Sequence, residues 1–227
     1  MKKPIAVFAI GILAASSTAA IAQSRANAEL TQATGVLQKL TGTHANAGIP
    51  GPVLHSAKCI AVVPKMLQAG FIVGGRHGNG VATCKMTNGS WSPPAPFSLT
   101  GASFGAQIGG QEMGYVMMIM NNKGMQALDS GHFKVGAGVS AAAGPVGREA
   151  SGSGGWKAAI LSYSLSKGAY VGATIQGAEL NQDHDATKQL YGREIGFSSI
   201  LNGHAPMPQA APAHRFIATV RKAVANG

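Results

Sequence analysis

The stretch CIAVVPKMLQAGFIVGGRHGNGVATC, residues 59 to 84, sets the pattern for the middle of this chain of 227 residues. Short apolar runs separated by glycine are typical of strands. Residues 71–74 and 81–84 are such runs, and they flank the segment GGRHGNG at 74–80. The spacing predicts a hairpin with this segment at its tip, where Arg76 would point into solvent.

The N-terminus has the three parts of a secretory signal peptide. Lys2 and Lys3 form a short positive region, residues 5–15 are apolar, and Ala20-Ile21-Ala22 is a small-residue cleavage site. The apolar part is short for a membrane span, although a retained anchor stays an alternative. We therefore expect residues 1–22 to be a signal peptide cleaved near Ala22. The mature protein is then periplasmic or secreted, either free or peripheral on a membrane.

Export bears on the two cysteines of the sequence, Cys59 and Cys84. In an oxidising compartment a single pair of cysteines is typically bridged, and the chain has no C-x-x-C motif that would favour redox or metal chemistry. We expect a structural disulfide between them.

The flanking segments are predicted to be helical. Residues 23–57 form an N-terminal helical segment with its main helix at 26–41, and residues 204–227 combine a Pro/Ala linker with an amphipathic helix at 213–225. The domain between them, residues 58–203, carries the strands. A third helix, capped by Asn181 or Asp183, ends at Gly192, and one or two helical turns surround Met125 and Leu128. Further strands are expected at 97–100, 115–120, 132–147, 158–164 and 169–180. The fold class is α+β, with a curled, mostly antiparallel sheet or partial barrel and helices at both ends.

The charge balance favours an anionic partner. The chain has 18 basic and 8 acidic residues, and removal of Lys2 and Lys3 with the signal peptide leaves 16 minus 8, a mature charge of +8. An exported basic protein is suited to phospholipid headgroups or other anionic surfaces, although a basic pI without a partner would look the same. Nucleic acid is not expected, because basic and aromatic residues do not alternate along the chain.

Catalytic and metal motifs are weak. Residues 101–105, GASFG, match the G-x-S-x-G pattern of a serine hydrolase with Ser103 as nucleophile, yet the glycines that follow disfavour the helix that such a site requires. Residues 181–192 begin like a calcium loop but lack its glycine and glutamate. A methionine cluster could bind Cu(I), but Met117 and Met118 are neighbours in a strand and must face opposite sides, so core packing is favoured. We expect no enzyme activity, no cofactor and no metal site.

Residues 58–203 resemble the SYLF lipid-binding domain family, in its exported bacterial form. The segments AKCIAVVP, GSWSPPAPFSLTGASFG, FKVGAGVSAAAGPVGR, ILSYSLSKGAYVGATIQGAEL and DHDATKQLYG carry this resemblance. It implies binding of membrane phospholipids, and for some eukaryotic members of actin. Actin is an unlikely partner for an exported protein.

The function expected is non-enzymatic, peripheral binding to anionic phospholipid membranes. Basic side chains would contact phosphate oxygens while a few apolar groups insert shallowly. Two alternatives remain, a cell-envelope interaction module that docks a protein partner through the helix at 213–225, and a serine hydrolase that uses Ser103. Each proposed lipid contact could also be an ordinary solvated cation. The proposed lipid contacts are Lys58, Arg76, His77, Lys85, Arg148 and Lys167.

Overall fold

The computed structural model describes residues 13–42, 48–105, 111–145, 157–166, 169–172 and 175–227. Its helices are α1 (Leu13–Thr41), α2 (Gly51–Ser56), α3 (Asn122–Asp129), α4 (His184–Tyr191), α5 (Phe197–Leu201) and α6 (Ala211–Asn226). Its strands are β1 (Cys59–Cys84), β2 (Ala95–Gly105), β3 (Gln111–Ile119), β4 (His132–Lys134), β5 (Ala141–Ala143), β6 (Ile160–Ser166), β7 (Ala169–Gly172) and β8 (Glu179–Gln182).

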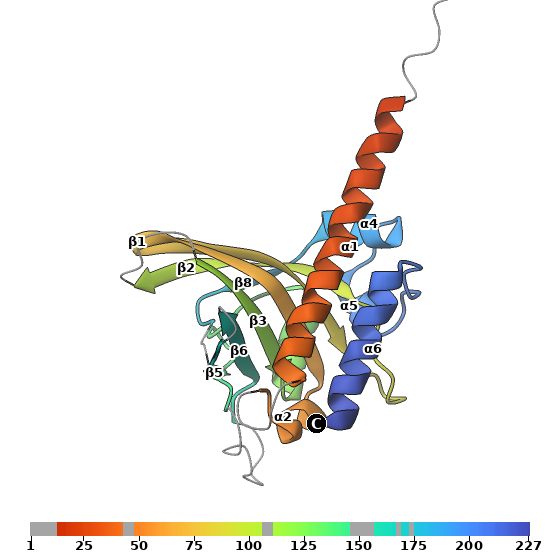
Figure 1. Cartoon of the computed structure of the whole chain (residues 1–227). Coiled ribbons are helices and arrows are strands. Elements are labelled where there is room, and N and C mark those ends of the chain that lie inside the picture. The colour runs from red at the N-terminus through yellow and green to blue at the C-terminus, as the bar shows by residue number, and fades with distance from the viewer. Residues whose placement is uncertain (1–12, 43–47, 106–110, 146–156, 167–168, 173–174) are drawn as a thin grey trace, which may run out of the picture.

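These strands form one curled sheet with the order β4-β8-β2-β1-β3-β6-β5, in which β7 also pairs with β6. Neighbouring strands are antiparallel except for β5 and β6, which are parallel. Helices α1 and α6 lie side by side against one face of the sheet (Figure 1). The expected α+β class, with a curled and mostly antiparallel sheet and helices at both ends, is confirmed.

The long strand β1 folds back on itself. Twenty-six extended residues would span roughly 85 Å, yet the Cα atoms of Cys59 and Cys84 are 4.0 Å apart and the two residues form a disulfide. The outgoing part, up to Gln68, pairs with β3, and the returning part, from Ile72, pairs with β2. The predicted disulfide is confirmed, and it joins the two ends of this element.

The predicted hairpin tip at 74–80 is wrong, because these residues lie inside the returning part of β1. The chain reverses earlier, between Gln68 and Ile72. The glycines serve close packing of the two parts instead of a turn. A Cβ atom on Gly78 would lie 2.7 Å from the Lys65 carbonyl oxygen, and one on Gly80 would lie 2.5 Å from that of Val62.

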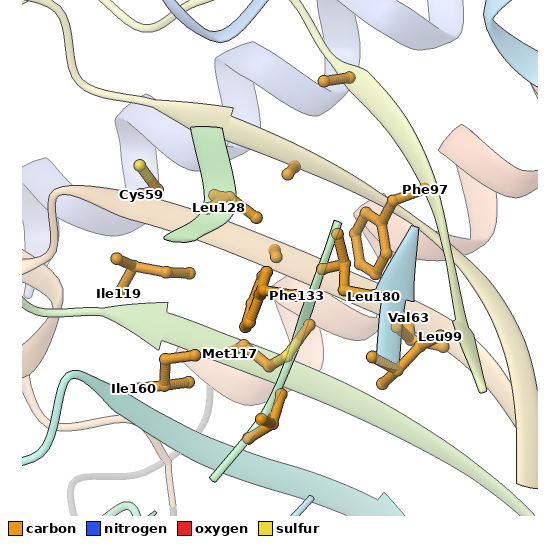
Figure 2. Close-up of a cluster of buried hydrophobic side chains, with 14 of the residues drawn as sticks. Cys59, Val63, Phe97, Leu99, Met117, Ile119, Leu128, Phe133, Ile160 and Leu180 are labelled. Atoms are coloured by element: carbon orange, nitrogen blue, oxygen red, sulfur yellow. The ribbon is translucent and has the colours of Figure 1, made fainter. Parts of the chain in front are cut away.

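Both faces of the sheet are buried, because strand residues alternate between two apolar clusters. Cys59, Ala61 and Met117 belong to the first cluster, which α3, α5, β4 and β8 help to form (Figure 2). Met118 belongs to the second cluster, beneath α1, α2 and α6. The methionines of β3 therefore fill two separate cores, as their spacing predicted.

The two terminal helices close the second cluster. Helix α1 buries Leu30, Ala33, Leu37 and Leu40, which recur every three or four residues. The buried side chains of α6 include Phe216, at 0% exposure. The expected C-terminal helix is thus confirmed, and its apolar face packs on the domain. The end of α6 meets the start of α2, where Gly227 packs against Gly51.

The shorter helices follow local capping signals. Asp183 caps α4 through its side chain, which accepts a hydrogen bond from the Ala186 amide, and Gly192 ends the helix with φ of 71°. Asn121 caps α3 in the same way. The expected strand at 132–147 is instead divided between β4 and β5, and the one at 169–180 between β7 and β8. No helix in the described part of the chain is long and apolar enough to cross a membrane.

Candidate functional sites

Ser103 lies inside a strand. It pairs with Gly74 near the end of β2, and the next element described along the chain is another strand, β3. A hydrolase elbow requires a sharp turn from a strand into a helix whose N-terminus supports the oxyanion. Among the described elements that helix does not follow β2, so the backbone around Ser103 does not have the geometry of a nucleophile elbow.

The predicted lipid contacts fall at two places along β1. Lys58 and Lys85 flank the bridged end of the strand, where the Lys85 amide donates to the Lys58 carbonyl at 2.7 Å. Arg76 and His77 lie nine and eight residues before Lys85, which is a separation of roughly 30 Å along an extended strand. Arg148 and Lys167 are outside the described residues. The four described cations therefore form two pairs, and their role in lipid binding stays a prediction.

Arg76 is engaged within the protein. Its side chain is half-buried, its Nη2 donates to the Gln176 carbonyl, and its Nε is buried without a hydrogen-bond partner. Burial lowers the pKa of the guanidinium, an effect that the nearby Tyr115 opposes. The neighbouring His77 faces the opposite side of the sheet, toward α1, where it is exposed.

A basic cleft of about 570 Å³ opens at the bridged end of β1, beside α2 and the last turns of α6. His55, Lys85 and Arg221 line it and are all exposed. Trp91, whose backbone pairs with Lys85, forms part of its wall. Among the described residues that line the basic cleft none is acidic.

A second cleft, of about 560 Å³, lies between α1, the middle of β1 and the start of α4. We call it the mixed-charge cleft, because both signs of charge line it. Its basic side chains are Arg25, Lys65 and His77, and its acids are Glu29, Asp183 and Asp185. The exposed Leu67, at 52%, stands at its edge.

Glu29 is the unusual residue of the mixed-charge cleft. Its Oε1 is buried and has no hydrogen-bond partner. Burial raises the pKa of its carboxyl to about 8, Asp183 adds to this rise, and Arg25 opposes it. No group of three His, Cys, Asp or Glu side chains suited to a metal ion occurs among the described residues.

The sequence profile of the family described as "Ysc84: Las17-binding protein actin regulator" matches residues 100–223. The chain belongs to this family. The match agrees with the resemblance to the SYLF domain that the sequence motifs indicated. It begins within β2 and ends within α6, and so includes Arg221 of the basic cleft and the acids Asp183 and Asp185 at the start of α4.

Three relatives show how much of the chain is shared with other proteins. Protein YSC84 of Saccharomyces cerevisiae is 33% identical over 168 residues, which is 72% of this chain and 36% of the relative. LAS seventeen-binding protein 3 of the same species is 33% identical over 175 residues, or 74% and 38%. SH3 domain-containing YSC84-like protein 1 of Homo sapiens is 27% identical over 195 residues, or 83% and 57%. The chain thus spans between about a third and three fifths of the length of these relatives.

Of the three basic residues that line the basic cleft, sequence reasoning predicted one and missed two. Lys85 was predicted, whereas Arg221 and His55 were not, because the contacts of α6 and α2 with the strand loop are long-range. The signal that could have found Arg221 is its place on the polar face of the C-terminal helix. Glu29 gave no signal, because an acidic residue in a helix is ordinary until its surroundings are known.

Proposed function

We propose that this protein is an exported, non-enzymatic module that binds anionic phospholipid membranes peripherally through the basic cleft. The observation that carries the proposal is the convergence of His55, Lys85 and Arg221 on one surface whose described lining contains no acid. Lys58 adjoins this surface through its backbone contact with Lys85. A basic side chain near an anionic membrane contributes about 1 kcal/mol to binding, so a few such residues are enough for reversible attachment.

Vesicle binding by variants tests the proposal. The double variant Lys85→Ala/Arg221→Ala removes two exposed cations of the cleft, and at about 1 kcal/mol each this predicts roughly 30-fold weaker binding to phosphatidylglycerol vesicles. Flotation of the protein, as processed and isolated from an expressing bacterium, with vesicles at rising salt measures the change. Binding of the unaltered protein should weaken with salt because exposed charges are screened.

A matched control separates the cleft from the overall charge. The variant Lys134→Ala/Arg193→Ala also removes two exposed cations, from β4 and from the segment after α4, and should bind as the unaltered protein does. Equal losses in both variants would assign binding to net charge and not to the cleft. Equal binding of the unaltered protein to neutral phosphatidylcholine vesicles would contradict the proposal.

A protein-binding module is the second candidate, and the names of the relatives favour it. The family description names Las17 and actin regulation, and the human relative is named for an SH3 domain. In this chain the apolar face of α6 is already buried, so a partner would have to contact another surface. A photo-crosslinking residue in place of Lys222, which is exposed on α6, should give a specific protein adduct in cells if a partner lies there. Actin stays an unexpected partner for an exported protein.

A further inference from the structure

We propose that the mixed-charge cleft binds a zwitterionic phosphoethanolamine group, with the ammonium toward Glu29 and the phosphate toward Arg25 and His77. This inference rests on the proposed membrane function but concerns a different surface. The basic cleft lies at the bridged end of β1, whereas the mixed-charge cleft lies beside the middle of this strand. A defect in one cleft can therefore be measured without a defect in the other.

The acidic side of the cleft contains a carboxyl oxygen without a hydrogen-bond partner. Glu29 comes from α1 and Asp183 and Asp185 from the start of α4, so three carboxyl groups of two elements line one wall. Asp183 accepts the capping bond from Ala186, whereas Oε1 of Glu29 accepts none. The terminal torsion of a glutamate is soft, so a small rotation can turn either oxygen toward the cleft. A ligand with N–H donors and a positive charge would supply the missing partner.

The basic side of the cleft suits an anion. Arg25 is exposed one helical turn before Glu29, and exposed His77 lies across the cleft on β1. The third cation, Lys65, pairs with Glu112 at 2.8 Å, so we assign no ligand contact to it. A guanidinium binds phosphate through two parallel hydrogen bonds, which favours phosphate as the anionic part of the ligand.

The exposed side chain of Leu67 suggests where the rest of the ligand lies. It stands at the edge of the cleft with 52% of its surface exposed. Among the described residues it is the one large apolar side chain with such exposure. A headgroup in the cleft would place the glycerol and the first acyl carbons of a phospholipid beside an apolar contact of this kind.

The ammonium requirement gives a sharp test. A primary ammonium has three N–H donors, whereas the trimethylammonium of choline has none. Phosphatidylcholine vesicles that contain phosphatidylethanolamine should bind the processed protein more tightly than phosphatidylcholine alone. At about pH 8.5, above the pKa of about 8 of the Glu29 carboxyl, the variant Glu29→Gln should lose this gain by roughly tenfold, because the amide carries no charge. Arg25→Gln, at an exposed position, should weaken the same binding.

Three controls keep the outcomes distinct. Glu179→Gln, which alters a glutamate on β8 outside the cleft, should keep the gain. Glu29→Gln should still bind phosphatidylglycerol vesicles, whereas Lys85→Ala/Arg221→Ala should lose that binding and keep the gain from phosphatidylethanolamine. Circular dichroism of each variant verifies that it is folded.

Soluble phosphoethanolamine distinguishes a lipid headgroup from the free compound. Chemical shift changes at Glu29 and Asp185 with both the soluble compound and the vesicles would support the cleft as a headgroup site, and changes with vesicles alone would add the contact at Leu67. Changes with the soluble compound alone would overturn the lipid assignment. No gain from phosphatidylethanolamine, or an equal gain in Glu29→Gln, would overturn the inference even if anionic vesicles bind.

Discussion

At the scale of single residues, Glu29 is the residue whose pKa departs furthest toward the neutral range from its value in solution. Its carboxyl is largely buried, one oxygen has no partner, and its pKa rises from 4.5 to about 8. Arg76 is a second example, since a cation expected at a solvent-exposed tip instead donates to the carbonyl of Gln176, in the turn before β8. In both residues burial shifts the pKa of the side chain from its ordinary value.

The raised pKa of Glu29 predicts a loss of stability as pH rises. Between about pH 4.5, where the unfolded carboxyl titrates, and about pH 8 the folded chain holds one proton more than the unfolded chain. The free energy of unfolding then falls with pH, and the cost at neutral pH is on the order of 3 kcal/mol. Glu29→Gln should therefore match the unaltered protein near pH 5 and exceed its stability near pH 8, which urea denaturation measures. A difference that is independent of pH would contradict the assigned cause.

At the scale of elements, β1 is the piece around which the sheet is arranged. It supplies two adjacent strands at the centre of the order, with β2 on one side and β3 on the other. The disulfide between Cys59 and Cys84 closes this element at its base. The sulfurs are buried in the first apolar cluster, so the bridge is covered by protein.

Removing the bridge should destabilise the protein without changing its fold. The chain-entropy estimate for a closed loop of this length is roughly 3.5 kcal/mol, because the bridge restricts the unfolded chain much more than it restricts the folded one. Cys59→Ala/Cys84→Ala should lower the free energy of unfolding by about this amount in urea denaturation. Reductant should destabilise the unaltered protein and leave the double variant unchanged. An equal effect of reductant on both would show that the bridge is not its target.

Local signals predicted the helices better than they predicted the strands. Asn121, Asp183 and Gly192 act on backbone groups within a few residues, so α3 and α4 could be placed from the sequence. The reversal of β1 could not, because glycine at 78 and 80 serves a close approach between the two strands as readily as a turn. The residues of the basic cleft show the same contrast between local signals and long-range packing. Lys85 could be proposed from its place near a strand end, but its neighbours Arg221 and His55 join it only through the packing of α6 and α2.

At the scale of the whole molecule, charge is distributed unevenly along the sheet. The basic cleft lies at the bridged end of β1, and the mixed-charge cleft lies beside the middle of this strand. Helix α1 packs on one face of the sheet, and its N-terminal part extends beyond the body of the domain. The proposed cleavage site after Ala22 lies within this helix, three residues before Arg25 of the mixed-charge cleft.

Processing at Ala22 is the prediction that applies to the whole chain. The protein isolated from the periplasm of an expressing bacterium should have the intact mass of residues 23–227, since Ala20 and Ala22 fit the small-residue requirement of the signal peptidase. Large side chains at both positions, as in Ala20→Leu/Ala22→Leu, should leave the unprocessed mass in the membrane fraction. An unprocessed mass for the unaltered protein in a soluble fraction would contradict the signal peptide.

The contact between Gly51 and Gly227 bears on how the basic cleft could be tuned. A methyl group on Gly51 would come within 1.7 Å of the Gly227 carbonyl oxygen, so α2 and α6 meet there at a spacing that tolerates no side chain. His55 and Arg221 are each carried by one of these helices, between one and two turns from the contact. A side chain at position 51 would therefore have to push α2 and α6 apart. We expect such a substitution to change the separation between His55 and Arg221 while both side chains are kept.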